Sequence, residues 1–325
     1  MEYLLKKKSY DYKKTLLILG VFVIVSGCLF LLWGLTKDNI DFFLPRRLKK
    51  IGAILLTSYC IGYSSVTFQT VTNNKILTPS VIGLDSLYQF IQTVIVFFFG
   101  SGQLVMMTSM NHFFLSIGFM LFFSFCLFVL LFWKEGKSIY FLVLAGMIIG
   151  GFFSGLTTFM QVLLDPNEFL ILQGKMFAGF DRINEQLFGI SVCIVLLSIV
   201  ITFKDYASLD AMSLGQDHAI NLGIPYRRML FKNLMNTAVL IAVSTALTGP
   251  ITFLGILVAS LSREMIKTYR HSYRVLGACL LGAFALIFGQ VMVERVFAFN
   301  TTISVIVNFV GGIYFIYLML KEAKR

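Results

Sequence analysis

Ten apolar stretches alternate with short polar segments along the chain. An α-helix needs about 20 predominantly apolar residues to cross a bilayer. We therefore predict ten transmembrane helices, at about residues 15–35, 51–71, 82–100, 113–133, 138–163, 186–203, 233–249, 251–266, 274–293 and 302–320. The third, seventh and eighth are the weakest, because polar residues or the pair Gly249-Pro250 interrupt them. The predicted fold class is an all-α polytopic membrane protein, with one transmembrane domain over residues 1–325.

Composition agrees with this pattern. Apolar residues make up 58% of the chain and charged residues 13%, whereas about one-quarter of a soluble domain is charged. The net charge of +11 would suggest a nucleic-acid partner in a soluble protein, but here the basic residues fall between apolar runs. We therefore expect a lipid bilayer around the chain and no nucleic acid.

The basic residues also predict the orientation of the helices. Short cytoplasmic loops carry an excess of Lys and Arg, and most of the 27 basic residues fall in alternate segments that include both termini. We expect both termini in the cytoplasm, with a cytoplasmic tail at 1–14, a cytoplasmic segment at about 204–232 and an outer segment at about 164–185. The run ending at Cys28 is similar to a lipoprotein signal, but it stays apolar beyond that cysteine, which favours an uncleaved first span.

Motifs for catalysis are missing from the sequence. It contains no G-x-x-x-x-G-K-[ST], H-E-x-x-H or G-x-S-x-G, and its five cysteines are scattered through apolar runs. We therefore expect no catalytic residue, no metal site and no cofactor in this chain. The spans also lack the repeated acidic pattern of an ion-coupled carrier. Active transport would then need a partner that supplies energy.

The cytoplasmic segment offers a place for such a partner. Residues 208–223 predict two short helices, with Asp210 or Ser213 capping the second and Gly223 ending it. Leu214, Ala219 and Leu222 would form an apolar edge. Such an edge either enters a groove of a partner protein or lies on lipid headgroups, and the pattern alone does not separate the two.

An ordered set of motifs makes the interpretation more specific. Leu214-Gly215-x3-Ala219-x2-Leu222-Gly223-Ile224 resembles the L-G-x-x-x-A-x-x-L-G-V segment of ferric-siderophore and cobalamin ABC importer permeases. The resemblance runs in one register from about residue 44 to the C-terminus, and it includes Arg47-Leu48-x-Lys50, Gln69, Asn74, Pro79-x3-Gly83, Gly249-Pro250-Ile251-x-Phe253-x-Gly255 and Gly311-x3-Phe315. Lys49, Lys75 and Ala259-Ser260 depart from the family pattern, which puts the local loop geometry in doubt.

The resemblance implies a type II ABC importer permease in a bacterial cytoplasmic membrane. Such a subunit moves ferric siderophore complexes from an outer binding protein to the cytoplasm by alternating access. The implied partners are a second, paralogous permease, two copies of a cytosolic ATPase that holds ATP and Mg, and the extracytoplasmic binding protein. Haem, cobalamin or another metal chelate stays open as cargo. An ion-coupled carrier or an intramembrane enzyme are the alternatives from other classes.

The resemblance also suggests roles for single residues. It implies coupling to the ATPase by Leu214, Gly215, Ala219, Leu222 and Gly223, and a cytoplasmic gate at Asn74 and Ile76. Outer basic residues are expected to dock the binding protein or to anchor lipid headgroups: Arg46, Arg47, Lys49 and Lys50. Polar residues within spans are candidates for the translocation path or for bonds between helices: Gln69, Asn236, Gln290 and Asn308. Gly146-x3-Gly150 and Gly151-x3-Gly155 predict close helix packing in the fifth span.

Overall fold

The structure is a computed structural model, and it describes residues 2–35, 39–106, 109–132, 139–181 and 183–323. These residues form ten helices of 12 residues or more, one for each predicted span. They are α1 (Glu2–Leu32), α2 (Ile40–Val71), α3 (Leu84–Met106), α4 (Ser109–Phe132), α5 (Ile139–Val162), α7 (Glu185–Thr202), α10 (Tyr226–Thr248), α11 (Leu254–Met265), α12 (His271–Val291) and α13 (Ile303–Ala323). The all-α prediction is confirmed.

Shorter helices fill the connections of the described chain. They are η1 (Pro79–Ile82), α6 (Pro166–Met176), η2 (Phe203–Asp205), α8 (Tyr206–Met212), α9 (Gln216–Asn221) and a π-helical turn, η3 (Met292–Val296). The two short helices predicted within 208–223 are therefore present as α8 and α9. Helix α6 within the outer segment was not predicted. It begins at Pro166 after Asp165, whose side chain accepts a hydrogen bond from the N–H of Asn167.

Two of the predicted spans are shorter than a membrane crossing. Eight helices of the described residues are long and apolar enough to cross a bilayer, but α3 and α11 are not among them. The apolar part of α3 ends at Gly100, whose φ of 76° breaks the helix. Helix α11 has only 12 residues, about 18 Å at 1.5 Å per residue, because the turn at Gly249-Pro250 delays its start.

Helix α2 lies at the centre of the bundle, between α10, α11 and α12. Its polar residues therefore face other helices rather than lipid. Ser58 donates a 2.6 Å hydrogen bond to the carbonyl of Cys279 in α12, and Gly62 lets the same stretch of α12 approach closely, since a Cβ there would lie 3.0 Å from the Cys279 nitrogen. Small and hydroxyl-bearing residues are typical of such contacts within membranes.

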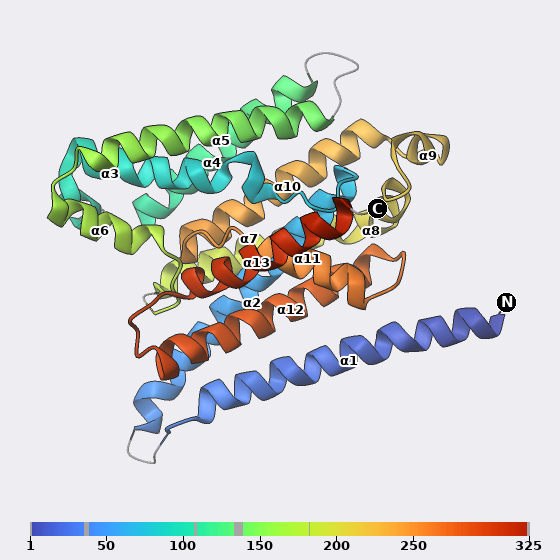
Figure 1. The fold of residues 1–325 in the computed structure, drawn as a ribbon, viewed down its shortest axis with the longest axis horizontal. Helices are drawn as coiled ribbons and strands as arrows, with labels where there is room; N and C mark the ends of the chain where they lie inside the picture. Colours follow the sequence, from blue (N-terminus) through green and yellow to red (C-terminus); the bar gives the residue numbers. More distant parts are fainter. Residues whose placement is uncertain (1, 36–38, 107–108, 133–138, 182, 324–325) are drawn as a thin grey trace.

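The segments predicted to be cytoplasmic lie at one end of the bundle. Figure 1 shows both termini, α8 and α9 at this end, which we call the α9 end. Helix α6, the start of α2 and the connection between α12 and α13 lie at the opposite end, which we call the α6 end. The fold thus separates two surfaces at opposite ends of the bundle.

Candidate functional site

Two glycines set the shape of the α8–α9 segment at the α9 end. Gly215 has a φ of +103° at the start of α9, and Gly223 has a φ of +79° just after its end, conformations that favour glycine. The predicted end at Gly223 is confirmed, but the predicted cap by Asp210 or Ser213 is wrong. Ser213 donates to the carbonyl of Asp210, and the Asp210 carboxylate accepts from the N–H of His271 at 2.5 Å.

The predicted apolar edge of this segment is divided between two faces. Ala219 is fully buried in a cluster with Leu209 and Met212 of α8. Leu214 is 61% exposed and Leu222 is 63% exposed, so they point away from the bundle. Leu214 and Leu222 of the segment are therefore exposed, whereas Ala219 packs against α8. Its role in coupling stays a prediction.

Polar contacts fasten the α8–α9 segment, and the η2 turn before it, to the long helices. At its start, Lys232 of α10 donates to the carbonyl of Ile201 at 3.0 Å and to the carboxylate of Asp205 at 2.9 Å. Further along, the Asp210–His271 bond joins α8 to α12. The buried ring of His271 lies 3.2 Å from the Thr67 hydroxyl and 3.3 Å from that of Thr70, both in α2.

The predicted gate residues lie in the connection between α2 and η1. The side-chain oxygen of Asn74 accepts from the N–H of Ile76 at 3.0 Å, which closes a local turn. Beyond this turn, η1 packs against α5 so closely that a Cβ on Gly150 would lie 2.8 Å from the Cα of Gly83. Close packing at Gly146 and Gly150 is confirmed, and it is against Ile82 and Gly83. The close packing predicted at Gly151 and Gly155 is wrong, because a Cβ on either would have nothing within 4 Å among the described residues.

The four predicted docking residues lie on the first turns of α2, which begins at Ile40 rather than near 51. Arg47 is buried, and its guanidinium donates to the carbonyls of Phe30 (3.2 Å), Leu31 (2.7 Å) and Trp33 (2.9 Å). Arg47 thus satisfies carbonyl groups at the end of α1 that lack helical partners. Its role in docking stays a prediction.

Lys50 joins three parts of the chain at the α6 end. Its ammonium lies 2.5 Å from the Asp181 carboxylate and 2.7 Å from that of Glu294. Gln290 donates to the same two carboxylates, at 3.3 and 2.9 Å. We call these four residues the Lys50 cluster. The sequence offered Asp181 and Glu294 only as isolated acids, because nothing in its spacing pairs them with Lys50.

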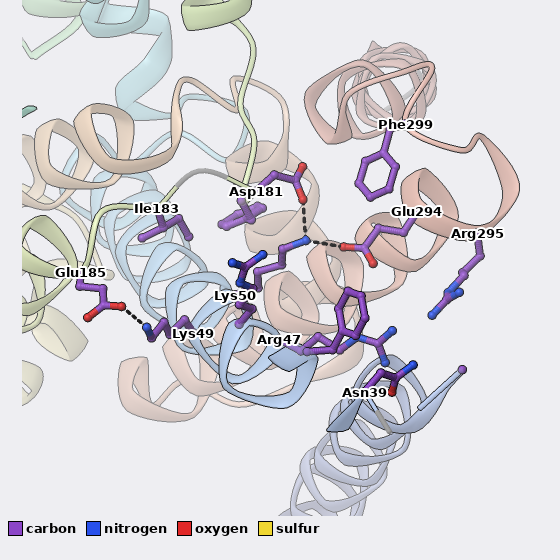
Figure 2. Close-up of a pocket in the computed structure, with 14 residues that line it drawn as sticks. Asn39, Arg47, Lys49, Lys50, Asp181, Ile183, Glu185, Glu294, Arg295 and Phe299 are labelled. Atoms are coloured by element: carbon purple, nitrogen blue, oxygen red, sulfur yellow. Dashed lines mark hydrogen bonds and ion pairs between the residues drawn. The ribbon is translucent and has the colours of Figure 1, made fainter. Parts of the chain in front are cut away.

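A cavity of about 610 Å³ opens beside this cluster. Figure 2 shows Lys50 between Asp181 and Glu294, with Lys49 turned toward Glu185. Arg46 also lines the cavity and is exposed, with its guanidinium 3.9 Å from the centre of the Phe42 ring. Five basic and three acidic side chains line the cavity in all: Arg46, Arg47, Lys49, Lys50, Arg295, Asp181, Glu185 and Glu294.

The four polar residues proposed for the path each have a different partner. Gln69 accepts from Arg263 at 2.6 Å, and Asn236 accepts from Ser198 at 2.7 Å. Asn308 accepts from the N–H of Phe253 at 3.4 Å, so it holds the turn before α11. Gln290 belongs to the Lys50 cluster. The amide nitrogens of Gln69 and Asn236 have no hydrogen-bond partner among the described residues, so these two side chains keep a free donor.

Groups of three or more His, Cys, Asp or Glu side chains that could hold a metal ion are not found in the described parts of the chain. The expectations of no metal and no cofactor stay predictions.

Comparison with known proteins places the chain among transporters. The FecCD transport family matches residues 15–321. The chain is 50% identical to the petrobactin import system permease protein YclO of Bacillus subtilis, over 96% of this chain and 98% of that protein. It is 35% identical to the petrobactin import system permease protein FatC of Bacillus anthracis, over 86% of this chain and 80% of that protein.

The fold has solved counterparts. An inward-facing metal-chelate type ABC transporter superposes with a TM-score of 0.80 at 22% identity, covering 95% of this chain and 99% of that one. PsaBC from Streptococcus pneumoniae has a TM-score of 0.57 at 14% identity, over 86% and 92%. The predicted ABC importer permease architecture is confirmed, and the chain is a multi-pass membrane protein. It belongs to the FecCD transport family.

Proposed function

We propose that this chain is the membrane-spanning subunit of an ATP-driven importer of ferric siderophore complexes, with ferric petrobactin as the cargo. The identity of 50% to a petrobactin import permease over almost the whole of both chains carries this proposal. Permeases named for hydroxamate and enterobactin systems match at only 22% and 23% identity. A second petrobactin permease, FatD of Bacillus anthracis, is also only 22% identical, so the preference for petrobactin rests on YclO and FatC.

Energy would come from outside the chain. In this proposal, two copies of a cytosolic ATPase bind ATP and Mg and receive α8 and α9, with Leu214 and Leu222 entering a groove of the ATPase. The exposure of these leucines beside a buried Ala219 supports that contact. A second, paralogous permease would complete the path. Gln69 and Asn236 each keep a free donor but are buried within this chain, so their role in the path stays a prediction. The turn at Asn74 and Ile76 would close the cytoplasmic side.

Docking of an extracytoplasmic binding protein is assigned to the α6 end. Its basic residues run against the usual excess of positive charge on the cytoplasmic side, and a cationic surface suits a partner with acidic residues. Arg46 and Lys49 are the most exposed of the four, so they would meet the partner first. Both termini then lie in the cytoplasm of a bacterial cell, inside its cytoplasmic membrane.

Uptake of labelled iron tests the proposed transport. The chain would be expressed with its paralogous permease, ATPase and binding protein in bacteria that lack other siderophore permeases. Ferric petrobactin should enter, unlabelled ferric petrobactin should compete, and haem and cobalamin should not. Substitution of the ATP-binding lysine of the ATPase should abolish uptake. Uptake that survives this substitution would show an ion-coupled carrier instead.

Chemical labelling tests the orientation. In a cysteine-free variant, Gln216→Cys in α9 and Asn167→Cys in α6 would be treated with a membrane-impermeant maleimide. The label should reach position 167 in intact cells, and position 216 only after the membrane is opened. Labelling of position 216 in intact cells would overturn the cytoplasmic placement of α9.

A further inference from the structure

We propose that Lys50 is an exchange point for ion pairs. A carboxylate of the docked binding protein takes the place of Asp181 on Lys50, and the release of Asp181 loosens residues 177–181 from the rest of the bundle. The inference rests on the proposed function of the α6 end as the docking surface.

The two carboxylates that hold Lys50 differ in accessibility. The side chain of Asp181 is 41% exposed, whereas that of Glu294 is 12% exposed and that of Lys50 is 18% exposed. Glu294 is also held by Gln290 at 2.9 Å, compared with 3.3 Å from Gln290 to Asp181. Asp181 is therefore the partner that an incoming group can replace, while Glu294 keeps Lys50 in position.

The charges around the Lys50 cluster favour the binding of an anionic group. Basic side chains outnumber acidic ones along the cavity wall, and Lys50 lines the cavity itself. An incoming carboxylate has the same charge and the same acceptor oxygens as Asp181, so replacing one with the other changes the free energy little. The exchange can therefore be reversible, as repeated docking requires.

The backbone around Glu294 is also unusual for a helix end. Glu294 lies in the π-helical turn η3, and π-helical turns are frequent at functional sites. Beyond it, Ala298 and Phe299 have φ values of 45° and 63°, and the ring of Phe299 lies 5.9 Å from the Lys50 ammonium. Residues without a glycine's freedom hold such conformations only where the surroundings impose them. The Lys50 cluster is part of those surroundings.

Residues 177–181 connect this surface with the interior. Within three residues of Asp181, the N–H of Gly179 donates to the carbonyl of Thr248 at 2.9 Å. Ala178 is fully buried against Gly249, where a Cβ would lie only 2.9 Å from the Cα of Ala178. Asp181 is thus only two residues along the chain from Gly179, which contacts the turn between α10 and α11. Displacement of Asp181 therefore moves Ala178 and Gly179, which pack against that turn.

Binding measurements on the assembled transporter in lipid nanodiscs test the exchange. The substrate-binding protein used in the uptake assay would be titrated against wild type, Asp181→Asn and Asp41→Asn. Asp41 is an exposed acid in the first turn of α2, so its substitution is a control for the loss of one negative charge. In D181N a neutral amide replaces the carboxylate that competes for Lys50. The binding protein should therefore bind about fivefold more tightly, the equivalent of a 1 kcal/mol surface ion pair. D41N should change the affinity less than twofold.

A third variant separates failure of the exchange from failure of the docking surface. Lys50→Met should weaken docking while the ATPase still co-purifies with the permease. If K50M weakens docking but D181N behaves like D41N, the exchange is wrong and the docking surface stands. If K50M docks as wild type does, both the exchange and the assignment of Lys50 to the docking surface are overturned. The transport function is tested separately, by the uptake of labelled iron.

Hydrogen exchange supplies a readout that affinity does not. Adding the binding protein should speed amide exchange of residues 177–181 in the wild-type complex, to about the rate that D181N shows without it. Unchanged exchange in this segment would overturn the release of Asp181.

Discussion

The carboxylate of Asp210 in α8 accepts a 2.5 Å hydrogen bond from the backbone N–H of His271, the first residue of α12. The first N–H groups of a helix lack partners within it, and an aspartate is suited to satisfy them. Because the His271 ring also lies beside Thr67 and Thr70 of α2, a displacement of α8 acts on both helices.

Asp210→Ala should therefore uncouple ATP hydrolysis from import. Loss of the cap costs about 1 kcal/mol, which is small for the whole fold but falls on the contact between α8 and α12. We expect iron uptake per ATP hydrolysed to fall severalfold. Asp210→Asn, which keeps an acceptor oxygen, should restore most of it, and Asp217→Asn in the exposed part of α9 should have no effect. Normal uptake per ATP in D210A would contradict this role.

The two faces of the α8–α9 segment should respond differently to substitution. Leu214→Ala together with Leu222→Ala removes exposed side chains, so we expect ATPase co-purification to drop with little change in Tm. Ala219→Leu overfills a buried site at a cost of about 1–3 kcal/mol, so its Tm should fall. Retention of the ATPase by the double variant would indicate that the leucines lie on lipid headgroups instead.

Substitutions of the neighbouring residues Arg46 and Arg47 of α2 should have different effects. Arg47→Met removes a charged donor from three carbonyl groups, and such bonds are worth about 1.5–3 kcal/mol each when made by a charged group. We expect a clear loss of Tm in detergent. Arg46→Met, which removes an exposed side chain, should leave Tm unchanged and weaken docking of the binding protein. Equal Tm values for the two variants would mean that Arg47 does not support α1.

Adjacent glycines in α5 provide a matched pair. A methyl group on Gly150 would meet the backbone of Gly83 at 2.8 Å, whereas one on Gly151 would have nothing within 4 Å. Gly150→Ala should therefore push η1 away from α5 and reduce uptake strongly, and Gly151→Ala should transport as wild type does. Uptake assays at equal membrane abundance would decide this, and full activity of G150A would exclude a close contact in the working protein.

The class of protein and the order of its helices could both be predicted from the amino-acid pattern. Long apolar runs cannot be placed in water, so ten helical segments followed from hydropathy alone, and the motif at Leu214–Gly223 identified the α8–α9 segment before any contact was known. Gly223 was correctly predicted to end α9, because a glycine is favoured where φ is positive.

The contacts of the polar residues could not be predicted, because they depend on how the helices pack. Asp210 was predicted to cap α9 but accepts a hydrogen bond from His271 of α12, 61 residues away in sequence. Lys50, Asp181 and Glu294 come from three distant segments, and the lengths of α3 and α11 depend on turns at Gly100 and Gly249. Hydropathy predicts whether a residue prefers lipid or water, and helical periodicity predicts which residues share a face of one helix. Neither contains the packing of helices against one another, which brings charges from distant segments together.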